Sequence, residues 1–181
     1  MMIFIITSIE CIERMIMMKI KIGNLIITEY CSDNKRKYHF IKEISEDPLI
    51  NRFLSDNMDE WLKDSEGVDK LSIGSAYIIA EDIKLIGIIK LAFLENNGTL
   101  NLHYGVHPSY RKQHYGTRIL QEVPKYIFKE MSEVKSIELY INEINKGSIH
   151  CAKNANFVYE REFQLRRDEC KMKVYVIKNS K

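Results

Sequence analysis

The sequence predicts a single mixed α/β domain built on one sheet. Its 181 residues suffice for one domain with a buried core. Short apolar runs rich in β-branched residues lie on both sides of one long stretch with helical periodicity, and no linker, repeat or low-complexity tract divides the chain. The expected order is strand, helices, three strands, helix, strand, helix and two strands, which is typical of a mixed sheet in the α/β or α+β classes.

Residues 1–17 form an uncertain N-terminal extension. Their unbroken apolar run covers only residues 1–6, which is too short for a membrane span or for the apolar core of a signal peptide. Two interpretations stay open: a start-site extension that ends before Met18, or an extra strand or helix packed on the domain. We therefore assign the domain itself to residues 18–181.

The first part of the domain is expected to contain one strand region and a group of helices. The sequence KIKIGNLIITEY after Met18 is rich in β-branched residues, with Gly23 as a bulge or a turn. Between Lys37 and Asp64 apolar residues recur every three to four positions, which predicts two or three short helices. Pro48 favours the start of one of them.

An antiparallel meander is predicted next. SAYIIA and LIGIIKLAFL are strands joined by a turn at Glu81 and Asp82, and TLNLHYGV is the third strand. The turn ENNG, residues 95–98, separates the second and third strands.

The apolar period then changes to that of a helix. From Gly116 to Met131 the apolar residues form one helical stripe, and Pro124 within it should kink the helix or remove one hydrogen bond. SIELYI is the next strand, and a short helix follows from about Lys146 to Asn154. FVYEREF and KMKVYVIK are expected to pair as a closing hairpin.

Composition excludes several classes of function. Lys plus Arg number 27 against 25 acidic residues, and a net charge of +2 gives no electrostatic basis for binding nucleic acid or an anionic membrane. The cysteines are widely spaced and lack zinc-ligand spacing, so we expect no metal site and four reduced, unpaired thiols: Cys11, Cys31, Cys151 and Cys170.

The segment VHPSYRKQHYGTRIL, residues 106–120, carries the main functional signal. It places a strand end, a polar loop and a helix start in immediate succession. Unpaired amides and the positive dipole end of a helix N-terminus bind anions, and Gly116 allows a phosphate to approach the backbone closely. Arg111, Lys112 and Arg118 add positive charge. The segment matches neither a Walker loop nor a dinucleotide fingerprint.

This segment resembles the acetyl-coenzyme A signature of the GNAT N-acetyltransferases, in which V-x-P-x-[YF] leads into [RQ]-x-x-G-x-[GA]. Arg111 and Gly116 match, while His114 stands where the first glycine is usual. Farther on, Asn145 to Ser148 and CAKNANFVYERE resemble the N-x-x-S and A-E-K-x-G-F stretches of the family. Asn156 replaces the usual glycine there and tolerates a left-handed backbone. The ribosomal-protein N-acetyltransferase branch is the most similar in pattern.

The resemblance implies a fold, a donor and a reaction. The strand that ends at Val106 splays from its parallel neighbour SIELYI, and the pantetheine arm of acetyl-coenzyme A lies in the gap. A primary amine attacks the thioester directly. The residues that the resemblance places around the coenzyme are Tyr104, Val106, Arg111, Lys112, Gln113, His114, Tyr115, Gly116, Thr117, Asn145 and Ser148.

The catalytic residues are predicted less directly. Asn101 and Ala152 occupy the positions where relatives often carry a glutamate and a tyrosine. We expect His103 to be the base, since imidazole titrates near neutral pH, and Ser148 to be the acid or a ligand of the pantetheine arm. An alternative is a coenzyme A-binding module without catalysis, with a regulatory or sensing role.

The acceptor is expected to be a protein N-terminus or a small-molecule amine. Polyamine or aminoglycoside acetylation stays open, and the acidic residues that would support it are Asp56, Asp59, Glu60 and Asp64. Early helices in the family also wall the acceptor site, which here would involve Phe53, Leu54 and Trp61; packing of these residues in the core is the alternative. We further expect a cytoplasmic protein that is a monomer or a homodimer and binds neither nucleic acid nor membrane.

Overall fold

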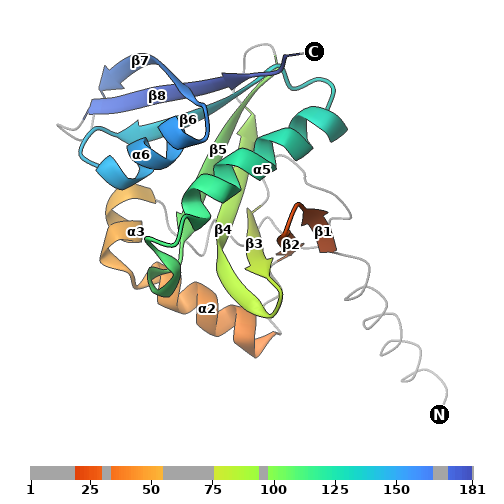
Figure 1. The fold of residues 1–181 in the computed structure, drawn as a ribbon. Coiled ribbons are helices and arrows are strands. Elements are labelled where there is room, and N and C mark those ends of the chain that lie inside the picture. The colour runs from red at the N-terminus through yellow and green to blue at the C-terminus, as the bar shows by residue number, and fades with distance from the viewer. Residues whose placement is uncertain (1–18, 30–33, 55–75, 94–97, 165–170, 181) are drawn as a thin grey trace.

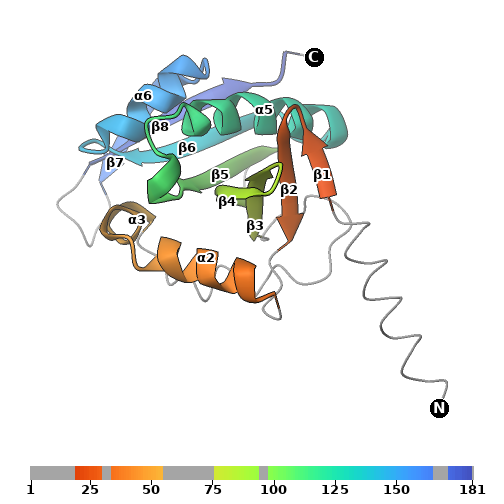
Figure 2. The ribbon, with the colours of Figure 1, turned by 60° about the horizontal axis from the view of Figure 1, so that its bottom comes forward.

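The fold is one mixed eight-stranded sheet with helices on both faces, seen in a computed structural model that describes residues 19–29, 34–54, 76–93, 98–164 and 171–180. Helices α5 and α6 cover one face, and α2 and α3 cover the other (Figure 1, Figure 2). The strand order is β1-β2-β3-β4-β5-β6-β8-β7. The bounds are β1 Lys19–Ile22, β2 Leu25–Glu29, α2 Lys35–Ser45, α3 Pro48–Leu54, β3 Ala76–Glu81, β4 Lys84–Phe93, β5 Thr99–Val106, a 3₁₀ turn Pro108–Tyr110, α5 Tyr115–Glu130, β6 Ser136–Asn142, α6 Lys146–Asn154, β7 Val158–Gln164 and β8 Lys171–Lys178.

The predicted first strand is a hairpin of two strands. Gly23 lies at its turn with φ of 57°, a conformation that glycine adopts without steric cost, so the turn interpretation is confirmed over the bulge. Helices follow where the periodicity predicts them, and α3 begins at Pro48. Residues 1–18 and 55–75 lie outside the described residues, so the start of the domain at residue 18 and the third helix remain predictions.

The predicted meander is confirmed. Strand β4 pairs antiparallel with β3 on one side and β5 on the other. The connection between β3 and β4 is tight, with Asp82 at φ of 54°. At the other end of the sheet, β7 and β8 form the predicted hairpin, and β8 lies between β6 and β7.

Strands β5 and β6 are parallel but pair over three positions only. Thr99 pairs with Ser136, and Asn101 is the last position to pair, opposite Glu138. Side chains reinforce this short seam: the Oγ atoms of Thr99 and Ser136 lie 2.9 Å apart, and Asn101 Nδ2 donates to the Glu138 carbonyl at 3.2 Å. Beyond Asn101 the two strands diverge, as the family resemblance implied.

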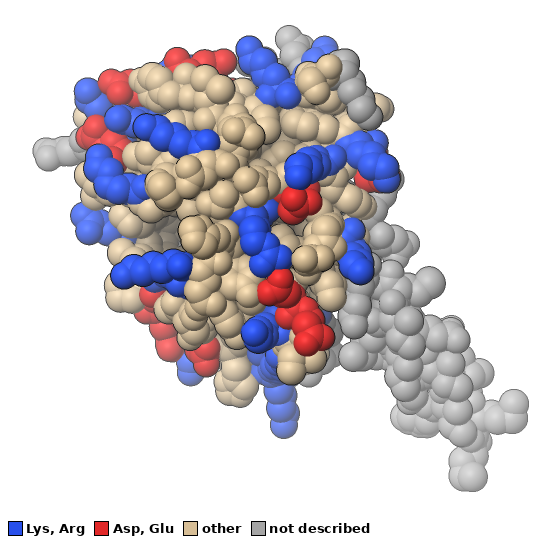
Figure 3. Space-filling model, viewed as in Figure 1, with Lys and Arg blue, Asp and Glu red and all other residues tan. Residues whose placement is uncertain are grey.

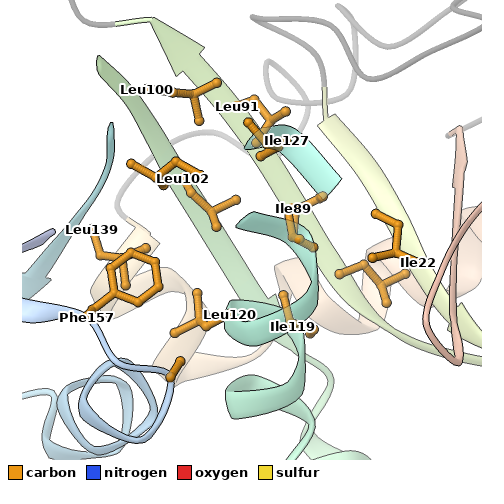
Figure 4. Packing of buried hydrophobic residues seen from close by; sticks show 14 of the residues in the cluster. Ile22, Ile89, Leu91, Leu100, Leu102, Ile119, Leu120, Ile127, Leu139 and Phe157 are labelled. Carbon is orange, nitrogen blue, oxygen red and sulfur yellow. The ribbon is translucent and has the colours of Figure 1, made fainter. Parts of the chain in front are cut away.

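The main core lies between the sheet and α5. Ile119, Leu120 and Ile127 of α5 project onto strand residues such as Leu102 and Ile89, and all five are buried (Figure 4). The helix continues through the buried Pro124, whose missing N–H removes one backbone hydrogen bond. A second, smaller cluster packs α2 and α3 on the opposite face. No helix in the described ranges is long and apolar enough to cross a membrane.

Candidate active site

The divergence of β5 and β6 opens a cavity of about 530 Å³, within the range of small-molecule sites. One part of its wall comes from the start of α5 and from α6, on one face of the sheet. Another part comes from α3, on the opposite face. The edges of β5 and β6 lie between these two parts, so the cavity passes through the sheet where the two strands separate.

The loop before α5 presents its backbone to this cavity. Lys112 and His114 adopt positive φ values of 60° and 63°, and alternating conformations of this kind turn successive amides toward one concave surface. The amide of Arg118 is the first in α5 to bond within the helix, 3.0 Å from the His114 carbonyl. The helix therefore leaves the amides of Tyr115, Gly116 and Thr117 without an intrahelical acceptor, which is an anion-binding arrangement.

Gly116 lies where two other side chains crowd the first turn of α5. A Cβ atom at this position would lie 3.0 Å from Cys151 Sγ and 3.4 Å from Tyr104 Cε2. The structure therefore supplies a second reason for glycine at this position: the close approach of α5 to α6.

Arg111 connects this loop to the corner between α2 and α3. Its guanidinium donates to both carboxylate oxygens of Asp47, at 2.6 and 3.1 Å, and its Nε donates to the Val106 carbonyl at 3.1 Å. Asp47 also accepts from the amide of Ile50 at 2.9 Å and thereby caps α3. Burial alone would raise the pKa of Asp47, but the hydrogen bonds from Arg111 and from backbone amides bring it below its ordinary value.

Arg118 is bound in a similar way. It donates to Glu81 at 2.6 Å, and the Tyr115 hydroxyl donates to the same carboxylate at 2.6 Å. The hydrogen bond from Arg118, followed by the one from Tyr115, lowers the pKa of Glu81. By contrast, Lys112 is exposed and forms no ion pair with any described residue. Lys112 is therefore the side chain of this loop whose charge is available to a bound anion.

Helix α6 contributes the wall opposite α5. Asn145 caps it, since its Oδ1 accepts from the amide of Ser148 at 3.1 Å, as the sequence predicted. The partly buried Ser148 lines the cavity. Gln113 does not line it, and its side chain is exposed and donates to the Ser109 carbonyl at 2.9 Å.

On the face of the sheet toward α3, β5 contributes His103, which lines the cavity and lies opposite Lys90 of β4. Tyr140 of β6 also lines the cavity, so an imidazole and a phenol flank the diverging strands. Asn101 is 2% exposed and bonded across the seam, and Ala152 is fully buried in α6. Neither residue carries a side chain that can transfer a proton.

Apart from Gln113, every residue predicted for the site lines this one cavity. The structure adds residues that the sequence did not indicate, chiefly Tyr140, Asn142, Leu49 and Ile50. Alternation in SIELYI, with Ile137, Leu139 and Ile141 on the core face, was a signal that Tyr140 lies on the other face. Phe53 and Leu54 line the cavity, whereas Trp61 lies outside the described residues.

The described residues contain no group of three or more His, Cys, Asp or Glu placed to hold a metal ion. Cys151 is a free thiol at the cavity wall, and the other three cysteines lie outside the described ranges. Basic and acidic side chains are interspersed over the face shown in Figure 3.

Comparison with known proteins agrees with this geometry. The family model described as the acetyltransferase (GNAT) family matches residues 38–157, which include the splayed strands, the loop before α5 and α6. The chain belongs to the GNAT acetyltransferase family. A search of curated protein sequences finds no match.

Solved GNAT structures share the fold at low identity. An acetyltransferase from Bacillus anthracis is 16% identical, with a TM-score of 0.74, over 91% of this chain and 100% of that one. RimL, the ribosomal L7/L12 α-N-protein acetyltransferase, was solved with coenzyme A. It is 13% identical with a TM-score of 0.65, over 88% of this chain and 97% of that one. Spermidine N-acetyltransferase from Vibrio cholerae, solved with coenzyme A and spermine, is 13% identical with a TM-score of 0.65, over 87% of this chain and 97% of that one.

The two departures from the GNAT glycine pattern keep the glycine conformation. His114 has φ of 63° and Asn156 has φ of 64°, both in the left-handed region. The left-handed backbone is therefore retained without glycine, and asparagine is a residue type that tolerates it.

Proposed function

We propose that this GNAT protein is an N-acetyltransferase that transfers acetyl from acetyl-coenzyme A to a primary amine by direct attack. One observation carries the proposal: the cavity joins an anion-binding helix N-terminus on one face of the sheet to a largely apolar chamber on the other face, through the gap between β5 and β6. A diphosphate on the amides of Tyr115 to Thr117, with Lys112 beside it, leaves the gap for a pantetheine arm.

The acceptor amine then approaches from the side of α3. His103 accepts the amine proton, the amine nitrogen bonds to the thioester carbon, and the carbon–sulfur bond breaks. The leaving thiolate takes a proton from Ser148, which lies on the α6 side of the same cavity. No covalent intermediate with the protein is required.

Among acceptors, the described wall favours an amine on an uncharged or weakly charged group. Leu49, Phe53 and Leu54 line the α3 side, and no carboxylate from the described part of the chain lines the cavity. This supports a protein N-terminus over a polyamine. The acidic positions Asp56, Asp59, Glu60 and Asp64 lie outside the described residues.

The test is release of free coenzyme A thiol from acetyl-coenzyme A with a panel of peptides, polyamines and aminoglycosides, set beside calorimetric binding of acetyl-coenzyme A. We expect turnover with at least one peptide N-terminus.

A second candidate function is a coenzyme A-binding module without catalysis. It is favoured by the buried, hydrogen-bonded Asn101 and by Ala152, which stand where relatives often carry a glutamate and a tyrosine. Binding without turnover on any acceptor would establish this second candidate and refute the enzyme.

A further inference from the structure

Tyr104 carries a buried hydroxyl that has no hydrogen-bond partner. The residue lies near the end of β5 and lines the cavity. Its hydroxyl oxygen is shielded from solvent and meets no described partner at hydrogen-bond distance and angle, although the Ser148 hydroxyl and the Cys151 thiol lie near enough to act on its pKa. Such a group costs about 1–3 kcal/mol relative to a bonded one.

The surroundings of this hydroxyl are well defined. The ring edge of Tyr104 packs on the first turn of α5 at Gly116, where Cys151 of α6 also approaches. Burial raises the pKa of Tyr104 well above its ordinary value, and the Cys151 thiol adds to this effect, while the Ser148 hydroxyl opposes it. The phenol therefore lies between the two helices that flank the cavity, next to the anion-binding turn.

We infer that the Tyr104 hydroxyl donates a hydrogen bond to the pantetheine arm of coenzyme A, and that this bond forms only in the complex. The inference rests on the proposed function, which places the arm in the gap beside β5. An amide or carbonyl oxygen of the arm is the kind of acceptor that the hydroxyl lacks in the free protein.

The hydroxyl acts as a hydrogen-bond donor and not as the acid that protonates the thiolate. Burial raises its pKa, so the phenol keeps its proton at neutral pH and is available as a donor. Tyr104 is therefore a positioning residue.

Tyr104→Phe tests the inference, because it removes the hydroxyl and keeps the ring. Without ligand the variant should be more stable than wild type, with a melting temperature raised by about 2 °C or more, since the orphaned polar group is gone. With coenzyme A it should bind about threefold to tenfold more weakly, because one hydrogen bond is lost. A residue with a purely structural role would not shift the two measurements in opposite directions.

Tyr115→Phe is the matched control for stability. The Tyr115 hydroxyl already donates to Glu81, so its removal should lower the melting temperature. A control ligand is the 3′-phosphoadenosine diphosphate portion of coenzyme A, which keeps the diphosphate but lacks the arm and should bind wild type and Tyr104→Phe equally.

Each result separates the two proposals. Wild-type protein that fails to bind coenzyme A would refute the proposed function. Wild type that binds coenzyme A with the same affinity as Tyr104→Phe would overturn only the role of the hydroxyl, as would a lowered melting temperature of the free variant. Equal weakening of both ligands would show that the hydroxyl does not contact the arm. Loss of kcat at saturating acetyl-coenzyme A, with unchanged affinity, would make Tyr104 an acid and overturn the positioning role.

Discussion

The Arg111 guanidinium holds the Asp47 carboxylate by two hydrogen bonds, 2.6 and 3.1 Å long, across 64 residues of sequence. This pair joins the N-terminus of α3 to the loop before α5, so the wall of the α3 side and the anion-binding amides are fixed relative to each other. Both side chains are largely shielded from solvent, with exposures of 27% and 9%, so removing one partner should cost more than at a fully exposed ion pair.

Arg111→Ala should lower the free energy of unfolding by about 2 kcal/mol, because it leaves Asp47 without its charged partner. Coenzyme A binding should weaken because the loop loses its order, and the salt dependence of binding should stay close to that of wild type. Urea unfolding and calorimetry at two salt concentrations measure these effects.

Lys112→Ala is the matched comparison. Lys112 is exposed and unpaired among the described residues, so its removal should leave stability unchanged and reduce the salt dependence of binding. If the salt dependence of coenzyme A binding falls in Arg111→Ala and stays unchanged in Lys112→Ala, then Arg111 and not Lys112 provides the charge for the bound anion.

The contribution of Asp47 to stability should depend on pH in a defined direction. Its pKa is lowered in the folded protein, so the contribution is fully present above the ordinary value of 3.8 and is lost as pH falls through the folded value. The difference in unfolding free energy between wild type and Asp47→Asn should be constant from about pH 7 to about pH 5 and shrink below about pH 4. A difference that grows on acidification would contradict this sign.

Gly116→Ala tests the packing between α5 and α6. The added methyl meets Cys151 Sγ at 3.0 Å, so we expect a loss of stability of about 1–3 kcal/mol and weaker coenzyme A binding as the first turn shifts. The double variant Gly116→Ala with Cys151→Ala should recover most of the lost stability and most of the coenzyme A affinity, because the methyl group then has room. If the double variant recovers stability but not binding, close approach of the ligand to Gly116 is the stronger requirement.

His103→Ala tests the base. Because imidazole accepts a proton only when neutral, kcat/KM of the wild type should decline on the acidic side, and the variant should lose about 10²-fold in kcat with coenzyme A affinity retained. His39, exposed on α2, provides a control substitution to alanine with wild-type kinetics. If the His103 variant keeps the wild-type kcat and pH profile, His103 is not the base, and the amine proton is lost to water or by ionisation of the substrate itself.

Local signals in the sequence predicted the elements that depend on local physics. Gly23 marked a turn, Pro48 a helix start, and Asn145 a cap, and all three lie where predicted because each acts on its own backbone. The left-handed conformation at Asn156 was predicted from the residue type on the same basis.

Contacts between distant segments were not predictable in this way. Arg111 reads as a phosphate ligand in the motif, and its pairing with Asp47 depends on how α3 packs against the sheet. Tyr140 was part of a predicted strand, but its place beside the gap follows from where β5 and β6 diverge. The partnerless Tyr104 hydroxyl depends on tertiary packing alone, which no sequence pattern records.

Because β5 and β6 pair over three positions only, the sheet should separate more easily between these two strands than between its other neighbours. Longer antiparallel registers flank this seam, β4 with β5 on one side and β6 with β8 on the other, and few backbone hydrogen bonds join β5 to β6. A ligand bound in the gap contacts both β5 and β6, so it stabilises the contact between the two halves of the sheet as well as being a substrate. Amides along the open edges of β5 and β6 should exchange with deuterium faster than those at the seam, and bound coenzyme A should slow them and make the two halves unfold as one unit.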